Sequence, residues 1–224
     1  SNTERLEVFT VDKTPPKIRV SYDNNAVLNG IYYRKARTAT VTVIEHNFDP
    51  AQITAKITSS AGAAPKLSGW SHSGDTHRAK LQFTRDADYT FRVSAIDRAG
   101  NRADDYRQGK YTLDRTSPRI SISGVKDKSA NNKTVAPEIR IRDANFAAES
   151  TEVTLTGVNR GEQDLKEMAR ISTENTGMTV KFKNFAGNMD DIYTLACRSV
   201  DKAGNESETA VRFSVNRDGS VYEI

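Results

Sequence analysis

The sequence predicts an all-β chain made of two sandwich domains in tandem, and three observations support this prediction. Apolar and polar residues alternate along many short segments, the same motifs recur after about a hundred residues, and the chain has 224 residues. Domains usually contain roughly 100 to 150 residues, so this length suffices for two domains that each bury a core.

Alternation with a period of two marks the strands, because alternate side chains of a strand face the same side. Short segments of this kind are separated by Gly, Asn, Asp and Pro. About six or seven of them per hundred residues are typical of a Greek-key sandwich of the immunoglobulin-like type. Helix is scarce, and only Gln163 to Arg170 has helical character. The clearest alternating sets are Ile18, Val20 and Tyr22; Tyr89, Phe91, Val93 and Ala95; Ile139 and Ile141; and Tyr193, Leu195 and Cys197.

An internal repeat sets the domain boundaries. Phe9-Thr-Val-Asp-Lys-Thr-Pro-Pro16 recurs as Tyr111-Thr-Leu-Asp-Arg-Thr-Ser-Pro118, and Phe213-Ser-Val-Asn-Arg217 is a weaker third copy. The equivalent positions Asp12, Asp114 and Asn216 are each 102 residues apart. We therefore expect domains at 12–113 and 114–217. Residues 1–11 are interpreted as a tag remnant followed by the last strand of a preceding repeat, and residues 218–224 as the start of a following segment.

Tyr89 and Tyr193 occupy equivalent positions near the start of the penultimate strand. A tyrosine there is expected to form a tyrosine corner, in which the hydroxyl bonds to upstream backbone. The single cysteine excludes an intrachain disulfide. Cys197 is equivalent to Val93, and we expect it to behave as a small buried apolar residue.

Charge and hydropathy exclude two classes of partner. The net charge of +4 comes from 33 basic and 29 acidic residues that are interspersed, so no nucleic-acid-binding face is expected. No apolar stretch reaches the ~18 residues that span a bilayer, so no membrane insertion is expected in this fragment. A signal peptide and an anchor are expected outside it, and the chain is expected to be a monomer.

Four motifs resemble the bacterial immunoglobulin-like domains that occur in tandem in surface proteins of Gram-positive bacteria. The resemblance covers nearly the whole chain, although the second domain lacks the tryptophan loop. It implies a stalk or adhesive module at the cell surface, secreted or attached to the cell wall, with no catalytic residues to transfer. The motifs are Val11-Asp-Lys-Thr-Pro-Pro16, Thr40-Val-Thr-Val-Ile-Glu-His-Asn-Phe-Asp-Pro50, Gly69-Trp-Ser-His-Ser-Gly-Asp-Thr-His77 and Asp97-Arg-Ala-Gly-Asn101.

Acidic and amide side chains are predicted to meet at the end of each domain where the chain enters. Calcium is one interpretation, because it binds six to eight oxygens. The favoured interpretation has no cofactor: Asp-x-Ala-Gly-Asn forms an ordinary hairpin turn, and Lys13, Arg98, Arg115 and Lys202 form ion pairs with the acids. The residues concerned are Asp12, Glu45, Asn47, Asp49, Asp97 and Asn101 in the first domain, and Asp114, Asp143, Asn145, Asp201 and Asn205 in the second.

Two further candidates lie in the first domain. Trp70 could stack on a sugar, but packing over the sandwich edge is favoured. His72, Asp75 and His77 share a loop and could offer three zinc ligands, although their context is that of a hairpin turn.

The sequence contains no motif of a nucleophile elbow, phosphate-binding loop, zinc protease or dinucleotide site, so no enzyme is expected. The leading hypothesis is a non-catalytic stalk or adhesin segment. The alternatives are a module that binds a carbohydrate or a host protein, and an accessory domain of a surface hydrolase.

Overall fold

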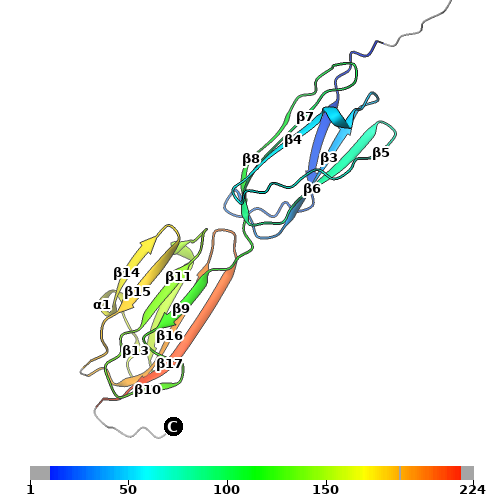
Figure 1. Ribbon diagram of the computed structural model, residues 1–224. Coiled ribbons are helices and arrows are strands. Elements are labelled where there is room, and N and C mark those ends of the chain that lie inside the picture. The colour runs from blue at the N-terminus through cyan, green and yellow to red at the C-terminus, as the bar shows by residue number, and fades with distance from the viewer. Residues whose placement is uncertain (1–10, 187, 218–224) are drawn as a thin grey trace, which may run out of the picture. The chain divides into compact units, whose positions relative to one another are not determined.

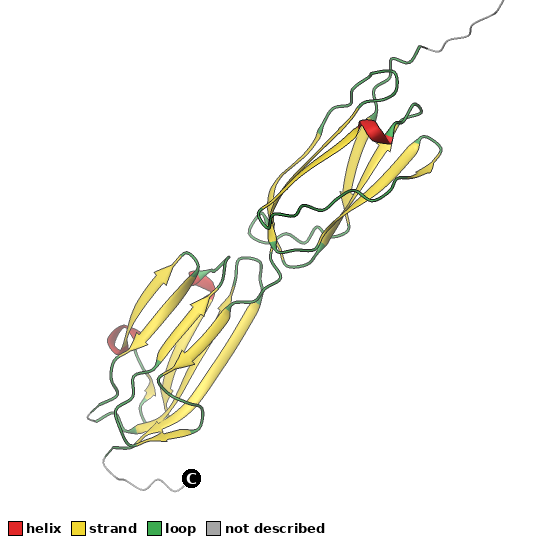
Figure 2. Cartoon of the chain, in the orientation of Figure 1, coloured by secondary structure: helices red, strands yellow, loops and turns green. Residues whose placement is uncertain are grey.

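The computed structural model describes residues 11–186 and 188–217, and the chain divides into two compact units. The first unit ends at Asp114 and the second begins at Arg115. The outer segments 1–10 and 218–224, which were interpreted as parts of neighbouring repeats, lie outside the described residues. The regular secondary structure of both units is almost entirely strand (Figure 2).

The first unit is a sandwich of two four-stranded sheets, with the orders β1-β3-β6-β5 and β2-β8-β7-β4. All ladders are antiparallel except that between β2 and β8, which is parallel. A 3-10 helix, η1 (Pro50–Gln52), precedes β4. The strands are β1 (Lys17–Tyr22), β2 (Tyr32–Tyr33), β3 (Arg37–Ile44), β4 (Ile53–Ser59), β5 (Ser71–Ser73), β6 (Thr76–Phe83), β7 (Ala87–Ala95) and β8 (Tyr106–Leu113).

The second unit repeats this plan with sheets ordered β14-β15-β11-β9 and β10-β17-β16-β12-β13 (Figure 1). The ladder of β10 with β17 is again parallel. The predicted helical character corresponds to one turn, α1 (Leu165–Met168), and η2 (Ala148–Ser150) precedes β12. The strands are β9 (Arg119–Ser123), β10 (Ser129–Asn131), β11 (Glu138–Arg142), β12 (Thr151–Gly157), β13 (Gly161–Glu162), β14 (Ala169–Glu174), β15 (Gly177–Phe182), β16 (Asp191–Val200) and β17 (Glu206–Val215).

Each core lies between the two sheets of its unit and is built from the alternating residues. In β3 every second residue is buried, including Val41 and Val43, and in β7 the same holds for Phe91 and Val93. Both tyrosine corners are present: the Tyr89 hydroxyl donates to the Arg85 carbonyl at 2.8 Å, and the Tyr193 hydroxyl donates to the Met189 carbonyl at 2.9 Å. The all-β immunoglobulin-like architecture is therefore confirmed.

Cys197 is buried in the second core, where only 2% of its surface is exposed. Burial raises the pKa of its thiol to about 11. A thiolate is the reactive form of cysteine, so this side chain acts as a packing residue.

A buried arginine in the first unit was not predicted. Arg37, the first residue of β3, is 3% exposed, and its guanidinium lies 3.8 Å from the ring centre of Tyr22 and 3.9 Å from that of Tyr33. The Tyr111 ring centre is 4.9 Å away. Arg37 Nε donates to the Asn24 carbonyl at 2.8 Å. We call Arg37 with Tyr22, Tyr33 and Tyr111 the arginine cage, and it joins β1, β2, β3 and β8.

Candidate functional site

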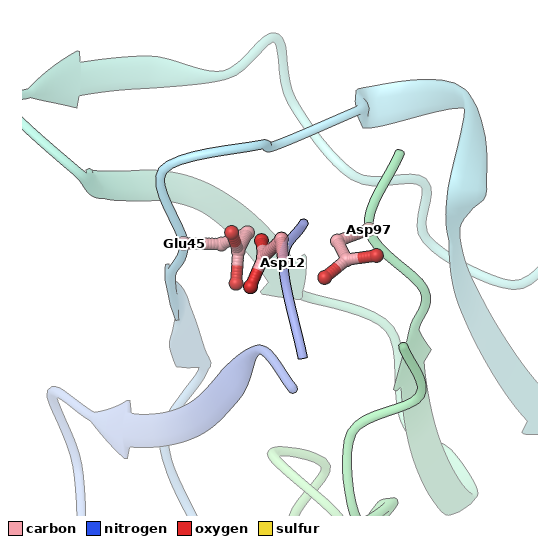
Figure 3. A group of neighbouring side chains, drawn as sticks. All are labelled: Asp12, Glu45 and Asp97. Carbon is pink, nitrogen blue, oxygen red and sulfur yellow. The ribbon is translucent and has the colours of Figure 1, made fainter. Parts of the chain in front are cut away.

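Three carboxylates meet at one end of the first unit. Asp12 lies in the entering segment before β1, Glu45 follows β3 directly, and Asp97 follows β7. Each offers a carboxylate oxygen, and these oxygens all lie within 4.8 Å of one another (Figure 3). Glu45 and Asp97 are buried and Asp12 is half-buried. We call these three residues the acidic pole.

The turn after β7 holds Asp97 in place. Its Oδ1 accepts from the Asn101 backbone N–H at 2.8 Å, and its Oδ2 accepts from Asn101 Nδ2 at 2.8 Å. Gly100 adopts a φ of 90°, a value that costs little only for glycine. The hairpin turn predicted for Asp97-Arg-Ala-Gly-Asn101 is therefore formed.

Two amides fasten the entering segment to the loops of the unit. Asn47 Nδ2 donates to Asp12 Oδ2 at 2.6 Å, and Asn101 Nδ2 donates to the Asp12 carbonyl at 3.1 Å. The Thr14 backbone N–H donates to Asp12 Oδ1 at 2.8 Å. The amide of Thr14, and next the side chain of Asn47, hold the pKa of Asp12 below its usual value. We call Asp12, Asn47 and Asn101 the entry clamp.

The polar neighbours of the pole differ from the prediction in two respects. Among the described residues, neither Lys13 nor Arg98 makes an ion pair with the pole, because backbone and amide N–H groups supply the donors instead. Asp49 does not join the pole. Its Oδ1 accepts from the Ala51 backbone N–H at 3.0 Å and so caps η1.

Equivalent residues come together in the second repeat. Carboxylate oxygens of Asp114, Asp143 and Asp201 lie within 4.8 Å of one another. Asp201 Oδ1 accepts from the Asn205 backbone N–H at 2.9 Å, and Asp201 Oδ2 accepts from Asn205 Nδ2 at 2.8 Å. Asp143 Oδ1 accepts from the Asn145 backbone N–H at 2.7 Å. The turn chemistry of the first unit is thus repeated.

These oxygens are of the type that calcium binds, but amide donors already engage them. In the first unit, Asp97 receives two hydrogen bonds from Asn101, and Glu45 Oε1 accepts from the Asn47 N–H at 2.7 Å. Such bonds offset the repulsion between close carboxylates, since a bond to the charged form stabilises it. In the first unit, hydrogen bonds from backbone and amide N–H groups therefore hold the carboxylates of the pole in place.

The histidines near this end make separate contacts. His46 Nδ1 lies 3.0 Å from Asp75 Oδ1, and the pairing with Asp75 raises the pKa of His46. His77 Nε2 lies 3.1 Å from the Glu45 carbonyl oxygen. Within the described ranges, the groups of three or more possible metal ligands are the two acidic ones, so His72, Asp75 and His77 do not form a zinc set.

Trp70 is half-buried and packs against the first core. Its ring lies edge-on to Phe48 at a centroid distance of 5.0 Å, and Phe48 stacks on His77 at 3.8 Å. This packing matches the interpretation that the tryptophan covers the sandwich edge.

Asp105 and Asp191, which each follow another aspartate in the sequence, make structural contacts. Asp105 pairs with Arg92. Asp191 is 1% exposed and accepts from the backbone N–H groups of Asn159, at 3.0 Å, and Arg160, at 2.9 Å. No sequence motif indicates that Asp191 holds this loop, because the loop residues lie about 30 positions away.

A helix long and apolar enough to cross a membrane is not present in the described part of the chain. A comparison with curated protein sequences found no match.

Solved structures with a similar fold come from several proteins. The N-terminal eight Ig domains of Down Syndrome Cell Adhesion Molecule align with a TM-score of 0.51 and 13% identity, covering 90% of this chain and 25% of that one. The I67-I69 fragment of titin aligns with a TM-score of 0.38 and 14% identity, covering 91% and 66%. The Yersinia pseudotuberculosis adhesin InvE aligns with a TM-score of 0.35 and 12% identity, covering 88% and 58%. At these identities the likeness concerns the fold, and only the first alignment is close enough to support it.

The family comparison gives a match at the level of sequence. A profile described as "Bacterial Ig-like domain (group 3)" matches residues 75–217, which begin within the first unit and include nearly all of the second. This match covers more than half of the chain, and it agrees with the two-sheet architecture and the tyrosine corners. The chain belongs to the bacterial Ig-like domain (group 3) family.

Proposed function

We propose that the two units form a non-catalytic extracellular segment of a bacterial surface protein, which spaces or presents a binding region at the cell surface. The entry clamp is the observation that carries this proposal. Asn47 and Asn101 come from two different loops, and both bond to Asp12 in the segment that leads into the unit. A domain that binds the segment leading into it through its own loops is suited to a tandem array, because this segment is held in a defined position.

The family supports the same role. Bacterial Ig-like domains are typically non-catalytic and extracellular, and the acidic pole is occupied by turn and clamp hydrogen bonds. We propose that these contacts operate without a cofactor, and that the segment is monomeric in dilute solution. Attachment to the cell wall, through an anchor elsewhere in the full protein, is part of this proposal.

Display on cells tests the spacing role. A surface anchor is joined to a terminal fluorescent tag through zero, one or two copies of the chain, and the height of the tag above the membrane is measured by interference microscopy. Spacing predicts that the height rises with each copy. A height independent of copy number would contradict it.

The alternative role is recognition of a glycan or host protein through the loops around Trp70. The contact of Trp70 with Phe48 favours a structural role for the indole. A glycan-array signal that is lost in Trp70→Ala and retained in Trp70→Phe, with the unit still folded, would favour recognition instead. The third alternative, an accessory domain of a surface hydrolase, is decided by the sequence of the full protein.

A further inference from the structure

The strand β14 forms an exposed edge of the second unit. It is the first strand in the order β14-β15-β11-β9, and β15 is its ladder partner (Figure 1). Every residue from Arg170 to Glu174 is exposed. An edge strand presents unpaired backbone N–H and C=O groups, which are a template for a further strand.

The two faces of β14 differ in character. Ile171 is the register partner of Val180, so both side chains lie on the core-facing side. Val180 is fully buried, whereas Ile171 is 46% exposed. The apolar side of the edge is therefore only partly covered.

The other face of β14 carries Arg170 two positions before Ser172 and Glu174 two positions after it. Arg170 is the register partner of Lys181, another cation, and Glu174 is the partner of Gly177. Among the described residues, neither Arg170 nor Glu174 makes an ion pair within 4.0 Å. A carboxylate placed opposite Arg170 would therefore lie beside two cations, Arg170 and Lys181, that make no ion pair among the described residues.

We propose that β14 pairs antiparallel with β14 of a second copy of this chain, about a two-fold axis at Ser172. In this register, each Arg170 lies opposite Glu174 of the second copy, and each Ile171 lies opposite Thr173. The ladder supplies backbone hydrogen bonds, and the two ion pairs fix the register.

The faces of the sheet restrict the possible registers. Partners in a ladder must point to the same face, so a symmetric pairing has to be centred on a residue and not between two residues. A centre at Ile171 places Arg170 opposite Ser172, and a centre at Thr173 places Ser172 opposite Glu174. Only the centre at Ser172 brings the opposite charges together twice.

Two other edges lack this complementarity. The edge strand β4 has Lys56 as its single charge, and a pairing centred there would bring two lysines together. The edge strand β9 has Arg119 as its single charge. The pairing at β14 involves five residues per copy, Arg170 to Glu174, far fewer than the 20 to 30 per side of a standard interface, so it is weak and requires high protein concentration.

Exchange of the charges tests the register. The association constant of the whole chain is measured by sedimentation equilibrium up to millimolar concentrations. Arg170→Glu alone and Glu174→Arg alone each place like charges opposite each other twice, and each should reduce the association constant at least about tenfold. An equimolar mixture of the two variants restores opposite charges at both positions and should associate as a heterodimer with the wild-type constant.

Arg119→Glu on β9 is the matched control, because it changes the net charge equally at the other edge of the same sheet. It should leave the association constant unchanged. The circular dichroism of each variant shows that it is folded. A wild-type chain that stays monomeric at millimolar concentration, an equal loss in Arg119→Glu, or a mixture that does not associate would each overturn the proposal. None of these outcomes bears on the spacing role, which needs no pairing.

Discussion

Two buried tyrosine hydroxyls close the same kind of loop in the two units. Tyr89 and Tyr193 each donate to a carbonyl four residues upstream, and their rings pack in the core. The net contribution of such a hydrogen bond is about 1 kcal/mol. Because the only tryptophan is Trp70, indole fluorescence follows the unfolding of the first unit alone.

Tyr89→Phe should therefore lower the unfolding free energy of the first unit by about 1 kcal/mol, since the ring contacts remain and the hydroxyl contact is lost. Denaturant unfolding followed by Trp70 fluorescence measures the change. Tyr193→Phe is the matched control and should leave this transition unmoved, although it weakens the second unit in circular dichroism. A fluorescence transition that shifts equally in both variants would contradict the independence of the two corners.

The clamp residue Asp12 links the stability of the first unit to pH. Its pKa is held below the usual aspartate value by the Thr14 N–H and then by the Asn47 amide, so the unfolded chain binds the proton more tightly. The resulting stabilisation is present above the unfolded pKa and is lost as pH falls through the lower folded value.

Asn47→Ala should therefore reduce the acid sensitivity of the first unit, because it removes one of the bonds that lower this pKa. The measurement is the unfolding free energy from Trp70 fluorescence between about pH 5 and 2. Asn145→Ala in the second unit is the matched control. An acid transition of the first unit that is identical in wild type and Asn47→Ala would contradict the clamp.

The arginine cage joins strands of both sheets of the first unit. Arg37 contributes cation–π contacts to three tyrosines and hydrogen bonds to the segment after β1. Burial raises the pKa of Tyr111 further above its usual value, so the ring stays neutral and Arg37 carries the charge of the cage.

Arg37→Ala should destabilise the first unit by about 3 kcal/mol, because it removes the buried contacts and leaves a cavity between the rings. Arg37→Met, which fills most of this volume, should cost less. Trp70 fluorescence in denaturant gives both values. Equal losses in the two variants would show that the charge and not the volume holds the cage together.

Three separate segments contribute the residues of the acidic pole, and we propose that hydrogen bonds hold them together without a metal. Addition of millimolar calcium or of a chelator should therefore leave the thermal midpoints of both units unchanged, since a ligand stabilises only the state that binds it. A midpoint that rises with calcium, and that loses this response in Asp97→Asn, would contradict the proposal that the pole needs no metal. It would assign the pole as a calcium site, with Asp201→Asn as the corresponding variant of the second repeat.

At the scale of the whole molecule, the fold was predictable because strand alternation and repeated motifs are local signals. Tyr89 and Tyr193 indicated the corners, and Asp97-Arg-Ala-Gly-Asn101 indicated its turn. The meeting of Asp12, Glu45 and Asp97 followed from the expected topology. The corners and the turn each lie within one short motif, and the acidic pole follows from the order of the strands.

The remaining contacts depend on details that the sequence pattern does not encode. Arg37 lies in a basic stretch that looks solvent-exposed, and its cage forms only because three strands bring tyrosines around it. Within the part of the chain that the structure describes, Lys13 and Arg98 do not form the expected ion pairs, because nearby N–H groups donate to the acids instead. The exposure of β14 follows from its position at the edge of its sheet, which residue alternation does not indicate.

The proposed role is that these units space or present a distal region without recognising a ligand themselves. In the full-length protein on its native cell, residues 12–217 are replaced by two unrelated Ig-like modules of similar length, and the binding of the cells through the distal region is measured beside a simple deletion. Deletion should reduce cell binding, and the unrelated modules should restore it. Restoration by the native units only would rule out a spacing role and show that their own surfaces bind a partner.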